Sequence, residues 1–533
     1  MATIYRNGRF FTGSDKSFAK CIVVQDGLIQ YVGDENHPTI EQTKKRDINE
    51  IDMLGRTILP GFIDGHMHLM LLGSSLKQLS LERCESLEDI RATIKAYAVT
   101  QPSLPRILCR GWMHSMTNGE AFASMIDDLD DRPIFIDSKD LHFTWCNSAA
   151  LQELGVEDKE DPAGGKIHRD ENGKTTGLLS ETAAQIFAWP HFANVSSMDQ
   201  KLEAIEEAIT AYTAVGCTGM VEMAMDENVW DVLQVLRSRK YLPFRLAAYW
   251  LIQPSSDEEK MISQVDRAIE LHRKYNLTTS PNCRIAGIKI ICDGVVDACT
   301  AALQEPYCNG KDPESLWTPS MLRRIVKHAD SSDLQCALHA IGDGAIKMAV
   351  DTLEAVCTPG KRHRIEHLEM ASPTDAKRLG QLGITASIQP VHSDPAILGA
   401  WPKLIGNHRA SRAFPYNEFH AGGAVLALGS DSPTAPHDPL VNLYTATTRR
   451  SARDLENKSI VNEAAILSLA TAISAATKGA AYSCFADAYT GSLEVGKKAD
   501  FVVLNMEWNP ENLLEARVVQ TWFEGQKVYA VDS

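Results

Sequence analysis

The chain has 533 residues, of which 44% are hydrophobic, and a formal net charge of −16 at pH 7. This length and apolar content are sufficient for a large core and for more than one domain. The net charge is strongly negative and the sequence contains no tract of basic residues. Both features argue against nucleic acid and anionic membranes as partners. No apolar run is long enough to span a bilayer, and residues 1–8 lack the apolar segment of a signal peptide.

Twelve cysteines are scattered along the chain without a C-x-x-C pair. In a large chain without an export signal, such cysteines are expected to be reduced and mostly buried. The three N-x-S/T sequons, at Asn194, Asn276 and Asn457, are then not expected to be glycosylated. Together these features predict a soluble, cytoplasmic protein.

Residues 1–56 are rich in short strands and turns, and residues 485–533 have the same character. Because these two segments flank the rest of the chain, we interpret them as the two halves of one small β-sandwich. From residue 57 to about 484, short β-branched runs alternate with helical stretches, which is the pattern of βα units around a parallel sheet.

Eight runs in this central region are predicted to be strands: Thr57–Asp64, Thr218–Ala224, Phe244–Ile252, Arg284–Cys292, Gln335–Ile341, Arg364–Leu368, Thr385–Gln389 and Val425–Ser430. Helices with apolar residues spaced three and four apart are predicted between several of them, at Gln200–Val215, Asp257–Tyr275, Pro319–Ser331 and Ala345–Val356. Eight parallel strands with intervening helices predict an α/β fold, a TIM-type (β/α)8 barrel. The active site of such a barrel lies at the carboxyl ends of its strands.

Residues 70–199 are too many for one crossover between the first two strands, so we predict an α+β insertion there. Its expected strands are Arg106–Cys109 and Arg132–Ile136, followed by a hairpin of Gly165–Arg169 and Lys174–Leu178. The turn of this hairpin contains Asn-Gly, a strong hairpin signal. We expect the insertion to fold over the mouth of the barrel, above the active site.

The first predicted strand leads into His66-Met67-His68. Side chains at positions i and i+2 of an extended chain point to the same side, so both imidazoles face one point. Two neutral imidazoles in this arrangement suit a divalent metal such as zinc. Two packed histidines would give the same pattern, so this motif alone does not decide the matter.

Four more polar residues lie at or near the carboxyl ends of later strands, namely Lys289, His339, His367 and Asp431. Each has a structural alternative. Asp293 could be the ion-pair partner of a buried Lys289, the two histidines could be satisfied core residues, and Asp431 could cap a helix. Their joint occurrence at one face of a barrel nevertheless predicts a metal centre.

Further motifs accompany these residues. In the first half they are Gly61 to His68, Gly111-Trp112, Asp128 to Pro133, His142 to Leu151 and Gly177 to Glu181. In the second half they are Gly287 to Lys289 with Asp293-Gly294, Thr300 to Leu303 with Pro306-Tyr307, His339 to Asp343, Arg364 to His367, Gln389-Pro390, Gly429 to Pro433 and Gly491 to Asp500. With these motifs the chain resembles the metal-dependent amidohydrolase superfamily along nearly its whole length. In particular it resembles amidohydrolase family 3, whose members include N-substituted formamide deformylases.

The resemblance implies a ligand set for two divalent metals. His66, His68 and Asp431 would ligate one metal, His339 and His367 would ligate the other, and Lys289 would bridge them as a carbamate formed with CO₂. Zinc is the default, with iron, manganese or cobalt as alternatives. If Lys289 is not carboxylated, one metal on His66, His68 and Asp431 is the simpler site.

The implied reaction is attack of a metal-activated hydroxide on the amide carbonyl of a small molecule, with Asp431 as general base and then general acid. His142 or Tyr307 would assist at the carbonyl. Further substrate contacts are expected from Asp293 and His392, and from the pocket residues Trp112 and Trp145. Each of these has a plainer reading, because a tryptophan is often a core residue and His142 could lie in a surface loop.

Three other functions stay open from the sequence. The same hydroxide would cleave an ester or a lactone. A deaminase is less favoured, because the segment after His339 offers Asp343 where those enzymes usually have a glutamate. A non-catalytic scaffold is disfavoured by the complete ligand set. A homodimer is expected by comparison with other large enzymes of this kind.

Overall fold

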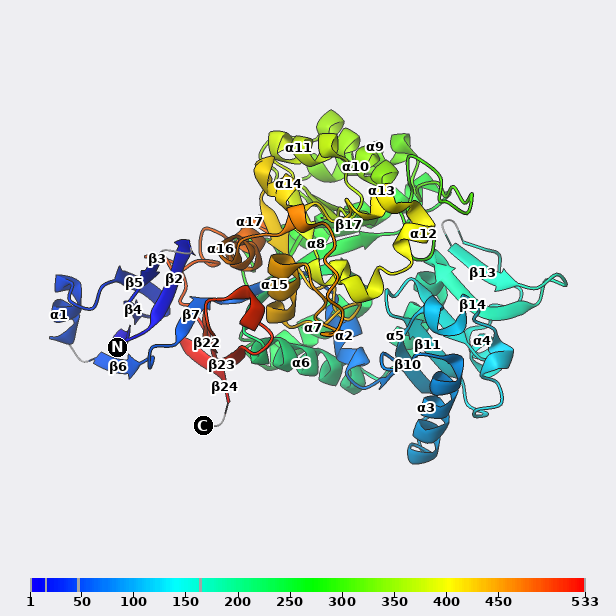
Figure 1. Cartoon of the computed structure of the whole chain (residues 1–533), viewed down its shortest axis with the longest axis horizontal. Coiled ribbons are helices and arrows are strands. Elements are labelled where there is room, and N and C mark those ends of the chain that lie inside the picture. Colours follow the sequence, from blue (N-terminus) through cyan, green and yellow to red (C-terminus); the bar gives the residue numbers. More distant parts are fainter. Residues whose placement is uncertain (1, 15–16, 46–47, 163–164, 532–533) are drawn as a thin grey trace.

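The computed structural model describes residues 2–14, 17–45, 48–162 and 165–531 (Figure 1). Its largest sheet has eight parallel strands in a nearly closed barrel. In sheet order they are β21 (Leu426–Leu428), β20 (Thr385–Ile388), β19 (Arg364–His367), β18 (Gln335–Ala340), β17 (Cys283–Ile291), β16 (Arg245–Ile252), β15 (Cys217–Met225) and β8 (Phe62–Met67). The predicted eight-stranded α/β barrel is therefore confirmed.

Helices follow the barrel strands and surround the sheet (Figure 1). They are α2 (Leu69–Ser75), α6 (Met198–Ala214), α7 (Glu227–Arg239), α8 (Glu258–Lys274), α9 (Pro319–Asp330), α10 (Asp343–Val356), α11 (Pro373–Leu382), α14 (Tyr416–Ala421), α15 (Pro439–Thr448), α16 (Leu469–Ser474) and α17 (Ala480–Ser483). The four predicted helices correspond to α6, α8, α9 and α10. In the described ranges, no helix is long and apolar enough to cross a bilayer.

The first predicted strand was wrong as a single element. Residues Thr57–Pro60 form β7, which pairs with a C-terminal strand in another sheet, and the barrel begins only at Phe62. The chain changes sheets at Gly61, where a Cβ atom would collide with the side chain of Thr218. The other seven predicted strands each coincide with one observed strand, with ends that differ by no more than two residues.

The barrel closes between β8 and β21 through individual hydrogen bonds. The Asp431 N–H donates to the His66 carbonyl at 2.7 Å, and the His68 N–H donates to the Ser432 carbonyl at 3.0 Å. Glycine allows this approach, because a Cβ on Gly65 would lie 2.5 Å from the Leu428 carbonyl oxygen. The closure brings the first and last strands together at their carboxyl ends.

Strands from both ends of the chain share one sheet, beside the barrel (Figure 1, blue and red). Its order is β24 (Gln526–Ala530), β23 (Arg517–Phe523), β22 (Phe501–Asn505), β7, β2 (Arg9–Ser14) and β3 (Ser17–Ala19). A second sheet contains β5 (Leu28–Gly33), β4 (Cys21–Gln25), β1 (Ala2–Arg6) and β6 (Ile48–Asp52), with helix α1 (Pro38–Lys44) before β6. One hydrophobic cluster includes Tyr5, Phe501 and Trp522, so side chains from both termini pack together.

Residues between α2 and α6 form a separate mixed sheet (Figure 1, cyan). Its order is β13 (Gly165–Arg169), β14 (Thr175–Glu181), β12 (Phe143–Cys146), β11 (Ile134–Ser138), β10 (Ile107–Trp112) and β9 (Leu79–Ser80), with helices α3 (Leu87–Thr100), α4 (Ser148–Leu154) and α5 (Trp189–Val195). The antiparallel pair β13 and β14 corresponds to the predicted hairpin. This segment has its own hydrophobic clusters.

Replacing Gly65 with alanine should destabilise the barrel. The added Cβ would meet a backbone oxygen of the closing strand, and overpacking of this kind costs about 1–3 kcal/mol. The measurement is the thermal unfolding midpoint of Gly65→Ala against Gly399→Ala, whose added Cβ would meet open space. Equal midpoints for the two variants would contradict the tight closure.

Candidate metal centre

The carboxylate of Asp431 lies between the two imidazoles of the His66-Met67-His68 motif. Its Oδ1 atom is 3.2 Å from His66 Nε2 and 3.0 Å from His68 Nε2. Asp431 has a φ of 56°, a left-handed conformation that is costly for a residue other than glycine. Burial alone would raise the pKa of Asp431, but the neighbouring imidazoles hold it well below its usual value, so this group is a carboxylate.

His367 and His339 complete the group of imidazoles. The ring centroid of His367 is 4.4 Å from that of His339 and 5.0 Å from that of His66. His367 has a φ of 74°, which interrupts the alternation of side chains at the end of β19. Burial lowers the pKa of both His339 and His367 well below the usual value, so both rings are neutral.

One grouping of possible ligand atoms differs from the predicted division into two ligand sets. One ligand atom each from His66, His367 and Asp431 lies within 4.8 Å of the others. The sequence analysis assigned His367 to a second metal together with His339. In the structure His367 is adjacent to both predicted sets.

Unpartnered nitrogen atoms indicate that the site suits a metal. Nδ1 of His68, Nε2 of His339 and Nδ1 of His367 are buried and have no hydrogen-bond partner among the described residues. Buried polar atoms are normally hydrogen-bonded, and exceptions call for an explanation such as a bound ion. Neutral imidazoles beside a carboxylate are ligands that divalent zinc prefers.

Lys289 lies on β17 with 2% of its surface exposed. None of the ion pairs found in the described chain involves its ammonium group, although a buried charge is costly without a partner. Burial lowers the pKa of Lys289 to about 8, against the opposing effect of the Glu366 and Asp431 carboxylates. A substantial fraction of neutral amine is therefore available near physiological pH.

Glu366 and Arg364 support His66 from inside the barrel. Glu366 Oε2 is 2.7 Å from His66 Nδ1, and Arg364 Nε donates to Glu366 Oε1 at 2.6 Å. Although burial would raise the pKa of Glu366, the Arg364 charge holds it well below the usual value. A carboxylate on the far nitrogen of a ligand histidine fixes its orientation and raises its basicity.

Glu222 occupies a similar place beside the second histidine of the motif. Its Oε2 accepts the Leu69 N–H at 2.5 Å, and its Oε1 is 3.9 Å from His68 Nδ1. Burial raises the pKa of Glu222 to about 7. The sequence analysis assigned no role to Glu222, Glu366 or Arg364. The signal it missed was a charged residue inside an apolar strand, which needs a buried partner.

His142 reaches the centre from the insertion. Its ring centroid is 5.9 Å from that of His339, and its Nδ1 is 2.5 Å from Glu181 Oε2. Burial alone would lower the pKa of His142, but the Glu181 carboxylate raises it to about 9. The insertion thus places a charged imidazole beside the metal-ligand candidates.

His392 lies on the opposite side of His367, in the segment after β20. The two rings are parallel within 7°, with centroids 5.9 Å apart. Nε2 of His392 is 3.1 Å from Thr434 Oγ1 and 3.6 Å from Asp431 Oδ2, while its Nδ1 is 3.5 Å from Glu369 Oε1. His392 thus lies beside the metal-ligand candidates, and the substrate contact expected from it stays a prediction.

The remaining expected substrate contacts are enclosed in the protein. Trp112 and Trp145 have no exposed surface and belong to the core of the insertion. Tyr307 is also buried, and its hydroxyl donates to the Ala301 carbonyl at 3.2 Å. Asp293 accepts backbone N–H groups from Ala302, Ile341 and Gly342, and thereby anchors the loop after β17.

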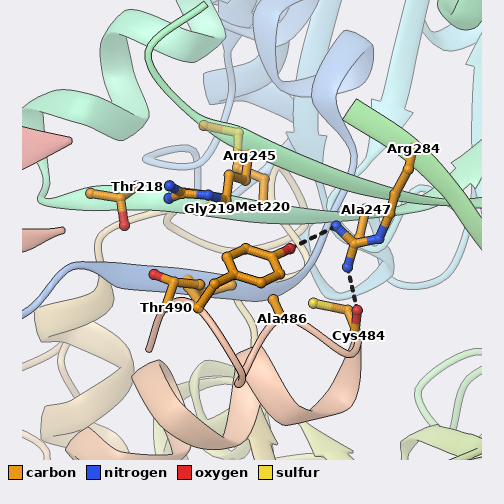
Figure 2. A pocket seen from close by; sticks show the side chains of 11 residues that line it. Thr218, Gly219, Met220, Arg245, Ala247, Arg284, Cys484, Ala486 and Thr490 are labelled. Atoms are coloured by element: carbon orange, nitrogen blue, oxygen red, sulfur yellow. Dashed lines mark hydrogen bonds between the residues drawn. The ribbon is translucent and has the colours of Figure 1, made fainter. Parts of the chain in front are cut away.

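A small cavity at the other end of the barrel is distinct from this centre. Figure 2 shows its lining, which includes Arg245, Arg284 and Tyr489. Arg245 and Arg284 lie near the amino ends of β16 and β17. Because the active sites of such barrels lie at the carboxyl ends of the strands, this cavity is not the candidate catalytic site.

Comparison with known proteins decides the family. Residues 49–529 match the model of the amidohydrolase family. The chain is 31% identical to protein LONG AFTER FAR-RED 3 of Arabidopsis thaliana, over 98% of this chain and 91% of that protein. The chain belongs to the amidohydrolase family.

Two further relatives extend the comparison. This amidohydrolase is 24% identical to the N-substituted formamide deformylase of Arthrobacter pascens, over 96% of this chain and 94% of that enzyme. A crystal structure of an uncharacterised metal-dependent hydrolase from Pyrococcus horikoshii OT3 matches 99% of the chain and 100% of its own length, with a TM-score of 0.77 and 23% identity. That structure has the same fold. As a member of its family, the chain is a metal-dependent hydrolase that acts on carbon–nitrogen bonds.

Replacing Glu366 with glutamine should weaken metal binding. Loss of an outer carboxylate typically lowers metal affinity by about 10–100-fold, and Arg364 would lose its buried partner. The measurement is zinc affinity by chelator competition, with Glu171→Gln in the exposed hairpin turn as the control. Wild-type affinity in Glu366→Gln would contradict the orienting role.

Proposed function

We propose that this amidohydrolase cleaves the amide bond of a small N-acyl or N-formyl compound. The proposal rests chiefly on the Asp431 carboxylate, which lies within 3.2 Å of both histidines of the motif at the carboxyl end of the barrel. The name of the Arthrobacter pascens relative, N-substituted formamide deformylase, supports this choice of bond.

The ligand set proposed for the metals follows the donor atoms of the site. His66, His68 and Asp431 would hold one zinc ion. His339 and His367 would hold a second, and Lys289 would bridge the two as a carbamate. The depressed pKa of Lys289, about 8, favours this modification, because only the neutral amine reacts with CO₂. The product is an anion, which suits a metal site better than an ammonium group.

A divalent metal would supply an acidified water and would polarise the substrate carbonyl. Asp431 would accept the proton of the attacking water and return it to the leaving nitrogen. Its low pKa keeps it ionised, which is the form that a general base needs before the reaction. Glu366 and Arg364 would keep His66 oriented throughout, since neither has contact with solvent.

His142 is proposed to stabilise the negative charge that develops on the carbonyl oxygen. Its raised pKa, about 9, keeps it a cation at neutral pH, and Glu181 fixes the orientation of its ring. A charged donor held in place before the reaction begins stabilises an oxyanion strongly.

Two other reactions are less well supported. An ester would be attacked in the same way, so ester hydrolysis is the second candidate. Deamination would need an acid beside the histidine of strand β18. The carboxylate of Asp343 instead accepts hydrogen bonds from the backbone and side chain of Gln304, at 2.9 and 3.1 Å. The acid that does lie beside this histidine is Asp293, whose Oδ1 is 3.6 Å from His339 Nε2, and it is occupied by three backbone N–H groups.

We further propose a division into three structural parts. The two terminal sheets would form a composite β-sandwich of residues 1–56 and 485–533. The barrel would span the chain between them, and the insertion of residues 70–199 would cover its mouth. The proximity of the His142 and His339 rings, whose centroids are 5.9 Å apart, supports the last point.

Replacing Asp431 with asparagine should abolish most of the activity. Loss of the general base typically costs about 10²–10⁴ in kcat. The assay is hydrolysis of N-formyl and N-acyl amides, with Asp158→Asn, an exposed aspartate, as the control. Metal content and unfolding midpoint are measured on the same samples. Wild-type turnover in Asp431→Asn would contradict the assignment.

Metal analysis tests the two-metal centre directly. We expect about two zinc ions per chain after reconstitution with zinc and bicarbonate, and an intact mass that shows CO₂ on Lys289. Lys289→Ala should lose bound metal. One metal per chain without added CO₂ would favour a mononuclear site and would call for an ammonia-release assay. A chain that binds none would contradict the proposal.

A further inference from the structure

We propose that Asp297 binds a positively charged group of the substrate, such as an ammonium or amidinium group. The inference adds a substrate class to the proposed function, and it rests on that function only for the identity of the ligand as a substrate. The physical argument concerns the position of Asp297, its fixed orientation and the absence of a counter-ion near it.

Asp297 lies in the loop between β17 and α9, and its surface is exposed to solvent. Nε1 of Trp401 donates to its Oδ1 at 3.1 Å. Trp401 is itself buried and stacks on Phe414, with ring centroids 5.2 Å apart. One carboxylate oxygen is therefore held on a rigid support, and no hydrogen bond to the other oxygen is found in the described chain.

Three parts of the molecule meet at Asp297. The next residue, Ala298, packs against the hydrophobic core of the insertion. Trp401 belongs to α12 (Trp401–Ile405), in the same segment after β20 that carries His392. Because the charge of His392 acts on Asp297, and His392 stacks on His367, we take the exposed Asp297 to border the entrance to the centre.

The carboxylates near this entrance have no lysine or arginine partner among the described residues. Asp297 and Asp140 form no ion pair with lysine or arginine within the described ranges, and Glu369 pairs with His392 alone. Although its side chain keeps contact with solvent, partial desolvation by the surrounding protein raises the pKa of Asp297 to about 7, and the charges of Asp140 and Glu369 act in the same direction. A bound cation would relieve this repulsion.

Unpartnered acceptor atoms of Glu181, beside the loop of Asp297, and of Gln389, after β20, favour the same kind of ligand. Oε1 of Glu181 and Oε1 of Gln389 are buried without a donor in the part of the chain that the structure describes. A Cβ on Gly294, in the same loop as Asp297, would lie 2.6 Å from Glu181 Oε1. Both of these unpartnered atoms are oxygens, so they can accept hydrogen bonds from N–H donors and would disfavour an anionic ligand.

The substrate class that follows is an N-acylated or N-formylated amine with a second, protonated nitrogen. Its cationic nitrogen would contact Asp297, while its amide would reach the metal-ligand residues. Carboxylate or phosphate groups on the substrate would be repelled at this entrance.

The test is a binding measurement on the zinc-reconstituted full chain. Benzylammonium and its neutral isostere benzyl alcohol are titrated by calorimetry at pH 7, and competition between them shows whether they share a site. We expect the ammonium to bind at least about tenfold more tightly. Asp297→Asn should remove about that factor, while Asp312→Asn, an exposed aspartate in the same loop, should leave it unchanged.

Equal affinity for the two probes, or equal effects of the two substitutions, would overturn the inference. Failure of the ammonium to bind at millimolar concentration would overturn it as well. Because binding is measured without turnover, these results are independent of amide hydrolysis. Hydrolysis of neutral formamides with no ammonium preference would support the proposed function and contradict this inference.

Discussion

The buried ion pair between Arg364 and Glu366 is the interaction on which the rest of the centre depends. Two charges inside a barrel are costly unless their hydrogen bonds are all made. Here Arg364 also donates to the Gly65 carbonyl at 2.6 Å and to Ser387 Oγ at 2.8 Å, so one guanidinium joins β19 to β8 and β20. Glu366 then holds His66 by its Nδ1 and leaves its Nε2 facing Asp431.

Backbone strain is concentrated at the same place. Asp431 and His367 both adopt positive φ values, which cost of order 1–3 kcal/mol each. The hydrogen bond from the Asp431 N–H to the His66 carbonyl maintains one of these conformations, and the closure of the barrel makes that bond possible. The geometry of the metal-ligand candidates therefore depends on the closure of the barrel, even for His68 and Asp431, which lie just beyond the ends of β8 and β21.

The insertion places charged groups beside the metal-ligand candidates. His142 and Glu181 come from its sheet, and the loop that carries Asp297 packs against its core. The proposed metal ligands come from the barrel strands and the residues directly after them. The groups proposed to meet the rest of the substrate come from the insertion and from the loops after β17 and β20.

The sequence alone determined the class of fold and the metal-ligand candidates. Periodicity predicted seven barrel strands to within two residues, and the spacing of His66 and His68 predicted that they face one point. The sequence could not show that Thr57–Pro60 belongs to the sheet of the chain termini. A short apolar run has the same appearance whether its strand lies in that sheet or in the barrel. Nor could it pair Glu366 with His66, which is 300 residues away. Such pairs, and the enclosure of Trp112 and Trp145, depend on how the strands close around one another, and only the tertiary structure decided them.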